Sequence, residues 1–184
     1  KFCETKIGEH VFDLGNTAIS NALIKKENFH SQETLYPLIL YTCPSCFLVQ
    51  IEEQASSENI FDDEYVYFSS LSSFWLSHAK EFSQKIIAKL NLNKESFVVE
   101  VASNDGYLLT NFVSHEIDCL GIEPTKSTAS EALSKGVPTL VEFFSLKLAK
   151  KFSNENRKAD LIIANNVLAH VPNINDFIAG FQEL

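Results

Sequence analysis

The sequence predicts an α/β fold in which a Rossmann-like parallel sheet, with helices on both faces, follows a small zinc-binding module. Short apolar runs alternate with helix-like segments from residue 96 onward, which is the pattern of a doubly wound parallel sheet. Residues 1–54 differ, because they are rich in turns and hold only short apolar pieces. Within them, Cys43 and Cys46 have the spacing of a zinc knuckle.

Residues 1–54 are predicted to form the small module from short strands and loops. The apolar pieces EHVFDLG and LYPLILYTC are too short for long amphipathic helices, so a large separate core is not expected. Residues 55–90 are predicted to be a linker followed by an amphipathic helix. In the stretch SFWLSHAKEFSQKIIAKLNL the apolar residues recur at helical spacing, and serine or asparagine residues lie near both ends.

Residues 91–184 are predicted to form the N-terminal part of the Rossmann-like domain. Its expected strands are 96–102, 117–124, 138–144 and 159–167, and its expected helices are 106–115, 125–136, 145–154 and 174–184. Short apolar strands that are joined by helices imply a parallel sheet, because parallel neighbours need crossover connections. Since Leu184 falls inside an expected helix, we expect the sequence to end partway through the domain.

Composition favours a cytoplasmic globular protein that binds neither a membrane nor a nucleic acid. No apolar run approaches the roughly 20 residues that a membrane span requires, and the opening KFCETKIGEH lacks the apolar core of a signal peptide. The formal net charge is -9, whereas a protein that binds nucleic acid normally presents a basic face. A basic cluster over residues 147–158 is interpreted as a solvated helix face. The oligomeric state stays open.

The segment after the first strand of the sheet is the strongest candidate for a ligand site. Ligands of open parallel sheets lie at the carboxyl ends of the strands, where strand order reverses. This segment has one glycine, Gly106, whereas the dinucleotide fingerprint G-x-G-x-x-G has three. Glu100 and Asp105 would repel a pyrophosphate and attract an ammonium or a sulfonium. S-adenosylmethionine (SAM) carries both cations and no phosphate, so the segment favours SAM over a nicotinamide dinucleotide.

Glu123 closes the second strand at the distance from the first turn where an acidic side chain can bind ribose hydroxyls. A solvated carboxylate at the end of a strand is the alternative. Asn104 and Asp105 are expected to form the turn with Gly106 and to cap the helix that follows. A turn of purely structural purpose is the alternative for these residues, and their combination with Glu123 favours a cofactor site.

His170 follows the polar pair Asn165 and Asn166 at the end of the fourth strand. Its unperturbed pKa lies close to neutrality, so it could act as a general acid or base beside a bound substrate. A packed or helix-capping histidine is the alternative.

The cysteines of the first module predict a structural zinc site. Two thiolates in the arrangement CPSC, Cys43 and Cys46, can reach one tetrahedral zinc ion. Cys3 is expected to be the third ligand, and a fourth could precede the first residue, with His10 a less favoured substitute. Such a closed site would hold the module together without doing chemistry. Unpaired thiols are the alternative, and Cys119 is expected to be a small buried hydrophobe in a strand.

Six segments occur in one order along nearly the whole chain: DLGNTAISNALI, YPLILYTCPSCFLVQ, YFSSLSSFW, VVEVASNDGYLL, LGIEP and ANNVLAHVPNINDF. Together they resemble the sugar C-methyltransferases with an N-terminal zinc-binding domain, which use SAM and act on nucleotide-activated keto-deoxysugars. The combination is more specific than any of its parts.

The resemblance implies a SAM site that is assembled from five parts of the chain. The serine-rich segment would close over the cofactor, and Phe144 would neighbour the adenine. His170 matches a histidine in the active site of the family, which strengthens the catalytic interpretation. The implied cofactor-binding residues are Tyr67, Ser69, Ser70, Ser72, Glu100, Ala102, Asn104, Asp105, Gly106, Glu123, Pro124, Phe144, Asn165 and Asn166.

The resemblance also implies a reaction, in which a carbon next to the ketone of the sugar is deprotonated and the enolate takes the sulfonium methyl group. His170 would assist the proton transfer or orient the sugar. The family continues with further strands, a Tyr/His/Glu segment and a second Rossmann-like half, so we expect this chain to be a fragment whose main base lies beyond Leu184. The alternatives are a SAM-dependent methyltransferase of another small molecule or of RNA, and a non-catalytic zinc-bearing interaction module.

Overall fold

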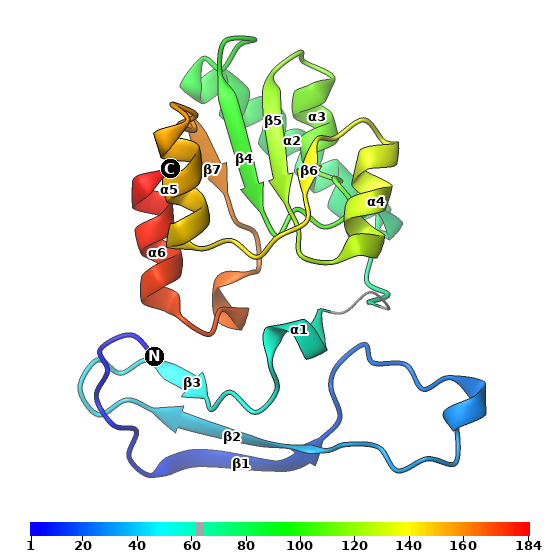
Figure 1. Cartoon of the computed structure of the whole chain (residues 1–184), viewed down its shortest axis with the longest axis vertical. Helices are drawn as coiled ribbons and strands as arrows, with labels where there is room; N and C mark the ends of the chain where they lie inside the picture. The colour runs from blue at the N-terminus through cyan, green and yellow to red at the C-terminus, as the bar shows by residue number, and fades with distance from the viewer. Residues whose placement is uncertain (62–64) are drawn as a thin grey trace. The chain divides into compact units, whose positions relative to one another are not determined.

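The computed structural model of the chain describes residues 1–61 and 65–184 (Figure 1). It divides into two compact units, the first made of Lys1–Val66 and Pro172–Asn175, the second of Tyr67–Val171 and Asp176–Leu184. Residues 62–64, which belong to the predicted linker, lie outside the described residues. The predicted boundaries near residues 54 and 90 stay predictions.

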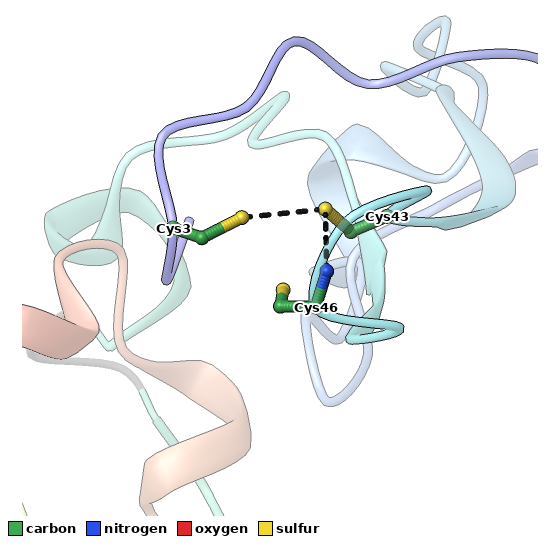
Figure 2. A group of neighbouring side chains, drawn as sticks. All are labelled: Cys3, Cys43 and Cys46. Atoms are coloured by element: carbon green, nitrogen blue, oxygen red, sulfur yellow. Dashed lines mark hydrogen bonds between the residues drawn. The ribbon is translucent and has the colours of Figure 1, made fainter.

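The first unit contains a three-stranded antiparallel sheet in the order β1-β2-β3. Its strands are β1 (His10–Thr17), β2 (Tyr36–Thr42) and β3 (Val49–Ile51), and its helical turns are η1 (Lys26–Asn28) and α1 (Ser57–Ile60). The short strands and loops predicted for this part of the chain are confirmed. The loop between β2 and β3 carries Cys43 and Cys46, which Figure 2 shows beside Cys3.

The second unit is built on a four-stranded sheet in the order β6-β5-β4-β7. Its strands are β4 (Phe97–Val101), β5 (Asp118–Ile122), β6 (Thr139–Leu140) and β7 (Leu161–Ile163), and every neighbouring pair is parallel. The chain runs outward from β4 through β5 to β6 and then returns to place β7 on the other side of β4. Strand order therefore reverses between β4 and β7, as it does between the two halves of a Rossmann fold.

Helices cover both faces of this sheet (Figure 1), which confirms the predicted fold class. One face packs against α2 (Ser73–Leu90), α3 (Leu109–Val113) and α4 (Lys126–Ser134), and the other against α5 (Leu146–Asn154) and α6 (Ile174–Glu183). Two short turns, η2 (Ser69–Leu71) and η3 (Leu168–His170), complete the unit.

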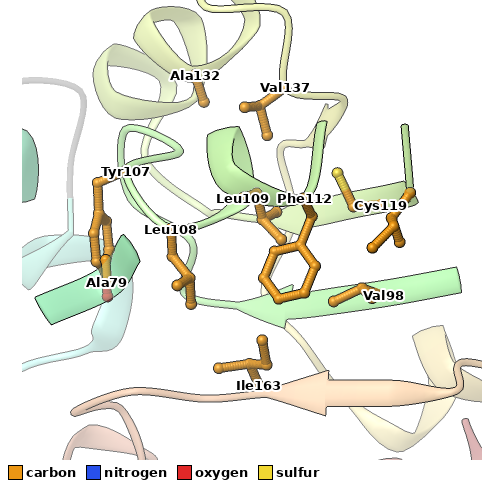
Figure 3. Close-up of a cluster of buried hydrophobic side chains, with 11 residues drawn as sticks. Ala79, Val98, Tyr107, Leu108, Leu109, Phe112, Cys119, Ala132, Val137 and Ile163 are labelled. Carbon is orange, nitrogen blue, oxygen red and sulfur yellow. The ribbon is translucent and has the colours of Figure 1, made fainter. Parts of the chain in front are cut away.

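The strands divide their side chains between two cores because successive residues of a strand point to opposite faces. Val98 of β4 and Cys119 of β5 join Phe112 of α3 in the first core, which Figure 3 shows. Val99, the next residue of β4, joins Phe152 of α5 in the second core. Cys119 is buried as predicted, and burial raises the pKa of its thiol to about 12.

The predicted amphipathic helix is confirmed as α2, and its ends follow from local chemistry. The Ser72 hydroxyl caps its first turn by accepting a hydrogen bond from the Trp75 amide at 3.2 Å. Asn91 ends it in the left-handed conformation, with a φ of 53°. No helix in the described ranges, α2 included, combines the length and the apolarity that crossing a membrane requires.

Candidate functional site

The turn after β4 has an unusual backbone. Ala102, Asn104 and Gly106 all have positive φ angles, of 57°, 51° and 74°. Alanine rarely adopts this conformation, so surrounding contacts must hold it there. The amide of Ala102 donates to the carbonyl of Ile122 at 2.8 Å, which ties the turn to the end of β5.

Gly106 is required by packing as well as by its φ angle. A Cβ atom at this position would lie 3.1 Å from the side chains of Ala132 and Val137, in the first core. The single glycine of the turn therefore allows α4 and the chain after it to pack closely against the turn. This explains its presence without a pyrophosphate in contact with the turn.

Glu123 stabilises the same turn through its side-chain hydrogen bonds. One of its carboxylate oxygens accepts from the Asn104 amide at 2.9 Å, and the other accepts from the Thr125 amide at 3.0 Å. The side chain is buried, so these two bonds fix the carboxylate in place. Each oxygen has two lone pairs and keeps capacity for a further donor, such as a ribose hydroxyl.

Glu100 is the most unusual group at the strand ends. Its side chain is only 1% exposed, and neither carboxyl oxygen has a hydrogen-bond partner among the described residues. Burial raises the pKa of Glu100 well above its ordinary value, and repulsion from Glu123 and Asp105 adds to the shift. Burying a polar group without a hydrogen-bond partner costs free energy. A hydrogen-bond donor or a cation of a ligand would therefore stabilise this carboxyl.

The serine-rich segment, residues 67–72, lies directly on the turn. The backbone amide of Ser69 donates to Oδ1 of Asn104 at 2.8 Å, and the side-chain Nδ2 of Asn104 donates to the carbonyl of Tyr67 at 3.0 Å. The Ser70 amide donates to Oδ2 of Asp105 at 3.2 Å. The structure thus brings together two segments that the sequence assigned to one site.

These contacts correct one expectation. The side chains of Asn104 and Asp105 do not cap α3, whose N-cap residue is Leu108 and has no side-chain cap. They bind the backbone of the serine-rich segment instead, because the turn directs them away from the helix that follows.

Lys135 belongs to the same cluster, and the sequence did not single it out. Its ammonium lies 3.1 Å from Oδ2 of Asp105, 3.1 Å from the Asp105 carbonyl and 3.2 Å from the Ser70 hydroxyl. It follows α4 directly, where a lysine is common and has no special significance in sequence.

Tyr107 is a second residue that sequence reasoning missed. Its pKa is raised to about 12, mainly by burial and then by the charge of Glu100. Its ring lies against Trp75 of α2, with the two ring centroids 6.0 Å apart. Hydrogen bonding with the side chains of Asn165 and Trp75 offsets part of the rise in the pKa of Tyr107.

The hydrogen bonds described above do not include four further predicted residues. His170 is exposed at the end of η3, and Asn166 is exposed with a φ of 53°. Phe144 is half-buried, and its ring packs edge-on against Phe177 and Phe181 of α6 at centroid distances of 5.5 and 5.3 Å. Pro124 follows Glu123 and is half-buried. The roles predicted for these residues stay predictions.

The three predicted metal ligands lie together in the first unit. The sulfur atoms of Cys3, Cys43 and Cys46 are all within 4.8 Å of one another, and those of Cys3 and Cys43 are 3.4 Å apart (Figure 2). Hydrogen bonds from Thr5, and then from the other two cysteines, lower the pKa of Cys3 to about 6. Three thiols that converge on one point fit zinc, which takes tetrahedral sulfur ligands at about 2.3 Å. His10 is not part of this cluster in the described part of the chain.

Comparison with known proteins finds a family model that matches the start of the chain and a relative that matches nearly all of it. Residues 1–61 match the family model described as "Putative zinc binding domain". The C-methyltransferase NovU of Streptomyces niveus is 25% identical over 174 residues, which are 95% of this chain and 41% of that protein. The chain therefore spans less than half the length of this relative. The resemblance to C-methyltransferases with an N-terminal zinc-binding domain, which the sequence segments indicate, is confirmed.

Among solved structures, one similar chain is the magnesium protoporphyrin IX methyltransferase ChlM from Synechocystis PCC 6803, determined with bound SAM. It has a TM-score of 0.46 and 17% identity, and the match covers 69% of this chain and 63% of that chain.

Proposed function

We propose that the second unit binds SAM at the carboxyl ends of β4, β5 and β7, and that the protein is a SAM-dependent methyltransferase. Glu100 carries this proposal, because it is a buried carboxyl without a partner among the described residues. Asp105 and Glu123 place two more carboxylates nearby, and all three favour a cationic ligand over a pyrophosphate. The similarity to a C-methyltransferase supports the same class of reaction.

The residues divide the proposed cofactor between them. Glu100 and the turn through Gly106 would face the methionine part, whose ammonium can donate to Glu100. Glu123 is held by two backbone amides and would accept hydrogen bonds from the ribose hydroxyls. The serine-rich segment on the turn would cover the cofactor. Asn165 and Asn166 would contact it from the loop after β7, and Phe144 would neighbour the adenine.

We infer that the substrate is a nucleotide-activated keto-deoxysugar, methylated at a carbon next to its ketone through an enolate. Bound SAM would supply an activated methyl group. The protein would align the two reactants and exclude water, and His170 would move a proton or orient the sugar. A cytoplasmic location and a role in deoxysugar biosynthesis belong to the same proposal. The similarity to a C-methyltransferase supports its coarser part, the transfer of a methyl group to carbon.

The first unit is proposed to hold a structural zinc ion through Cys3, Cys43 and Cys46. The convergence of their three sulfur atoms supports this. The ion would join the start of the chain to the β2–β3 loop and stabilise a unit with little core of its own.

Calorimetry with S-adenosylhomocysteine tests the proposed cofactor site. We expect the unmodified chain to bind this product and Glu123→Ala to bind it at least tenfold more weakly, since buried hydrogen bonds to a charged group contribute about 1.5–3 kcal/mol. The exposed Glu95, changed to glutamine, is the matched control and should leave the affinity unchanged. No binding by the unmodified chain, or equal binding by Glu123→Ala, would refute the assignment.

A further inference from the structure

Lys135 connects three segments that lie far apart in the sequence. Its ammonium binds Asp105, 30 residues away, and the hydroxyl of Ser70, 65 residues away. The Asp105 side chain is 0% exposed and that of Lys135 is 26% exposed, so water only partly screens the pair. The end of α4, the turn after β4 and the serine-rich segment therefore meet at one ion pair.

The Asp105 carboxylate is the centre of this network. Its Oδ2 accepts from the Ser70 amide at 3.2 Å and from Lys135 at 3.1 Å. Lys135 also donates to the Ser70 hydroxyl, so it contacts the serine-rich segment both directly and through Asp105. Removing the ammonium would leave Asp105 buried with the Ser70 amide as its remaining donor among the contacts described.

The three carboxylates of the site differ in how they are satisfied. Glu123 accepts two backbone amides. Asp105 pairs with Lys135 through Oδ2, whereas its Oδ1 has no partner in the described ranges, and neither oxygen of Glu100 has one. Lys135, which also lies 3.5 Å from Glu131, thus offsets the charge of Asp105 and leaves Glu100 as the carboxyl most open to a ligand. The net charge of the site then depends on one lysine outside the turn.

We propose that Lys135 is a positioning residue with two roles. As a latch, it holds the serine-rich segment against the turn after β4, and as a counter-ion it offsets the charge of the Asp105 carboxylate. Only the counter-ion role rests on the proposed function. SAM carries a net charge of +1 and S-adenosylhomocysteine is neutral overall, because they differ by the sulfonium. A change in the charge of the site must therefore act on the two ligands unequally.

The latch is tested without any ligand, by hydrogen exchange of residues 67–72. Lys135→Met should speed the exchange of the Ser69 and Ser70 amides about tenfold or more, since their bonds to the turn open more often. Ser70→Ala removes only the hydroxyl contact and should have a smaller effect. Lys85→Met is the control, because Lys85 is 80% exposed and pairs only with Glu81 in the described contacts. Unchanged exchange in Lys135→Met would overturn the latch.

The counter-ion role is tested by calorimetry with both ligands. Lys135→Met leaves Asp105 uncompensated, so the affinity for S-adenosylhomocysteine should fall more than the affinity for SAM. We expect the ratio of the two dissociation constants to change threefold to tenfold, roughly as for one charge acting over about 10 Å in a partly solvated site. Lys135→Arg, which keeps the charge, should restore the ratio of the unmodified chain.

The outcomes separate the two proposals. Equal losses for both ligands in Lys135→Met would overturn the counter-ion role, because a merely structural defect weakens both alike. An unmodified chain that binds neither ligand would overturn the proposed function, and the exchange measurement would still decide the latch.

Discussion

Replacing Glu100 with glutamine should weaken cofactor binding and change how stability depends on pH. Glutamine has nearly the same shape as glutamate and cannot ionise. In the unliganded chain, burial raises the pKa of Glu100 above its ordinary value of 4.5, so folding favours the protonated carboxyl. The contribution of Glu100 to stability is then full below the unfolded pKa and is lost as the pH rises through the folded pKa.

The magnitudes follow from this shift. Between the two pKa values the unmodified chain should lose up to about 1.4 kcal/mol of unfolding free energy per pH unit relative to Glu100→Gln. The same substitution removes the carboxyl that would ionise beside the ammonium of the cofactor and accept its hydrogen bond. A hydrogen bond to a charged group contributes about 1.5–3 kcal/mol, so affinity should fall roughly tenfold to 150-fold.

Two assays read these effects. Denaturant unfolding at pH 5 and pH 8 gives the difference in stability between the two proteins, and calorimetry with S-adenosylhomocysteine at pH 8 gives the affinity. Glu95→Gln serves as the control in both, because Glu95 is exposed. If the stability of Glu100→Gln relative to the unmodified chain does not rise with pH, or if binding is unchanged, the assignment of Glu100 is wrong.

Two further predictions concern the scaffold. Gly106→Ala should lower the unfolding free energy by about 1–3 kcal/mol, because the φ angle is 74° and a Cβ atom would lie 3.1 Å from Ala132 and Val137; unchanged stability in denaturant unfolding would contradict this. Cys46→Ser, or removal of metal with a chelator, should abolish zinc in elemental analysis and speed hydrogen exchange in β1 to β3, with the second unit unaffected. Cys119→Ala should retain the metal, and a purified chain without zinc would refute the metal site.

The alternation of strands and helices in the second unit could be predicted because each element carries its own pattern. β4 is apolar on both sides, as a central strand covered by two layers of helices must be, and its five residues are all buried. The third and fourth strands are the least accurate elements, since β6 holds only Thr139 and Leu140 of the expected 138–144, and β7 only Leu161–Ile163 of the expected 159–167. They are the two edges of the described sheet, where burial and pairing constrain the sequence least.

The turn and its carboxylates were recognisable because they are close in sequence to a buried strand. Lys135 and Tyr107 were not, because their importance arises from contacts across the fold. Lys135 resembles any lysine at the end of a helix until its ammonium is seen on Asp105. Tyr107 resembles an ordinary core residue until its ring contact with Trp75 and the effect of Glu100 on its pKa are known.

The central claim is that the strand ends hold a cofactor that carries an ammonium group and no pyrophosphate. Side-by-side calorimetry of the chain with S-adenosylhomocysteine and with NAD tests it most directly. The account predicts binding of S-adenosylhomocysteine that Glu123→Ala weakens at least tenfold, and no measurable binding of NAD. Binding of NAD in preference to S-adenosylhomocysteine would contradict it.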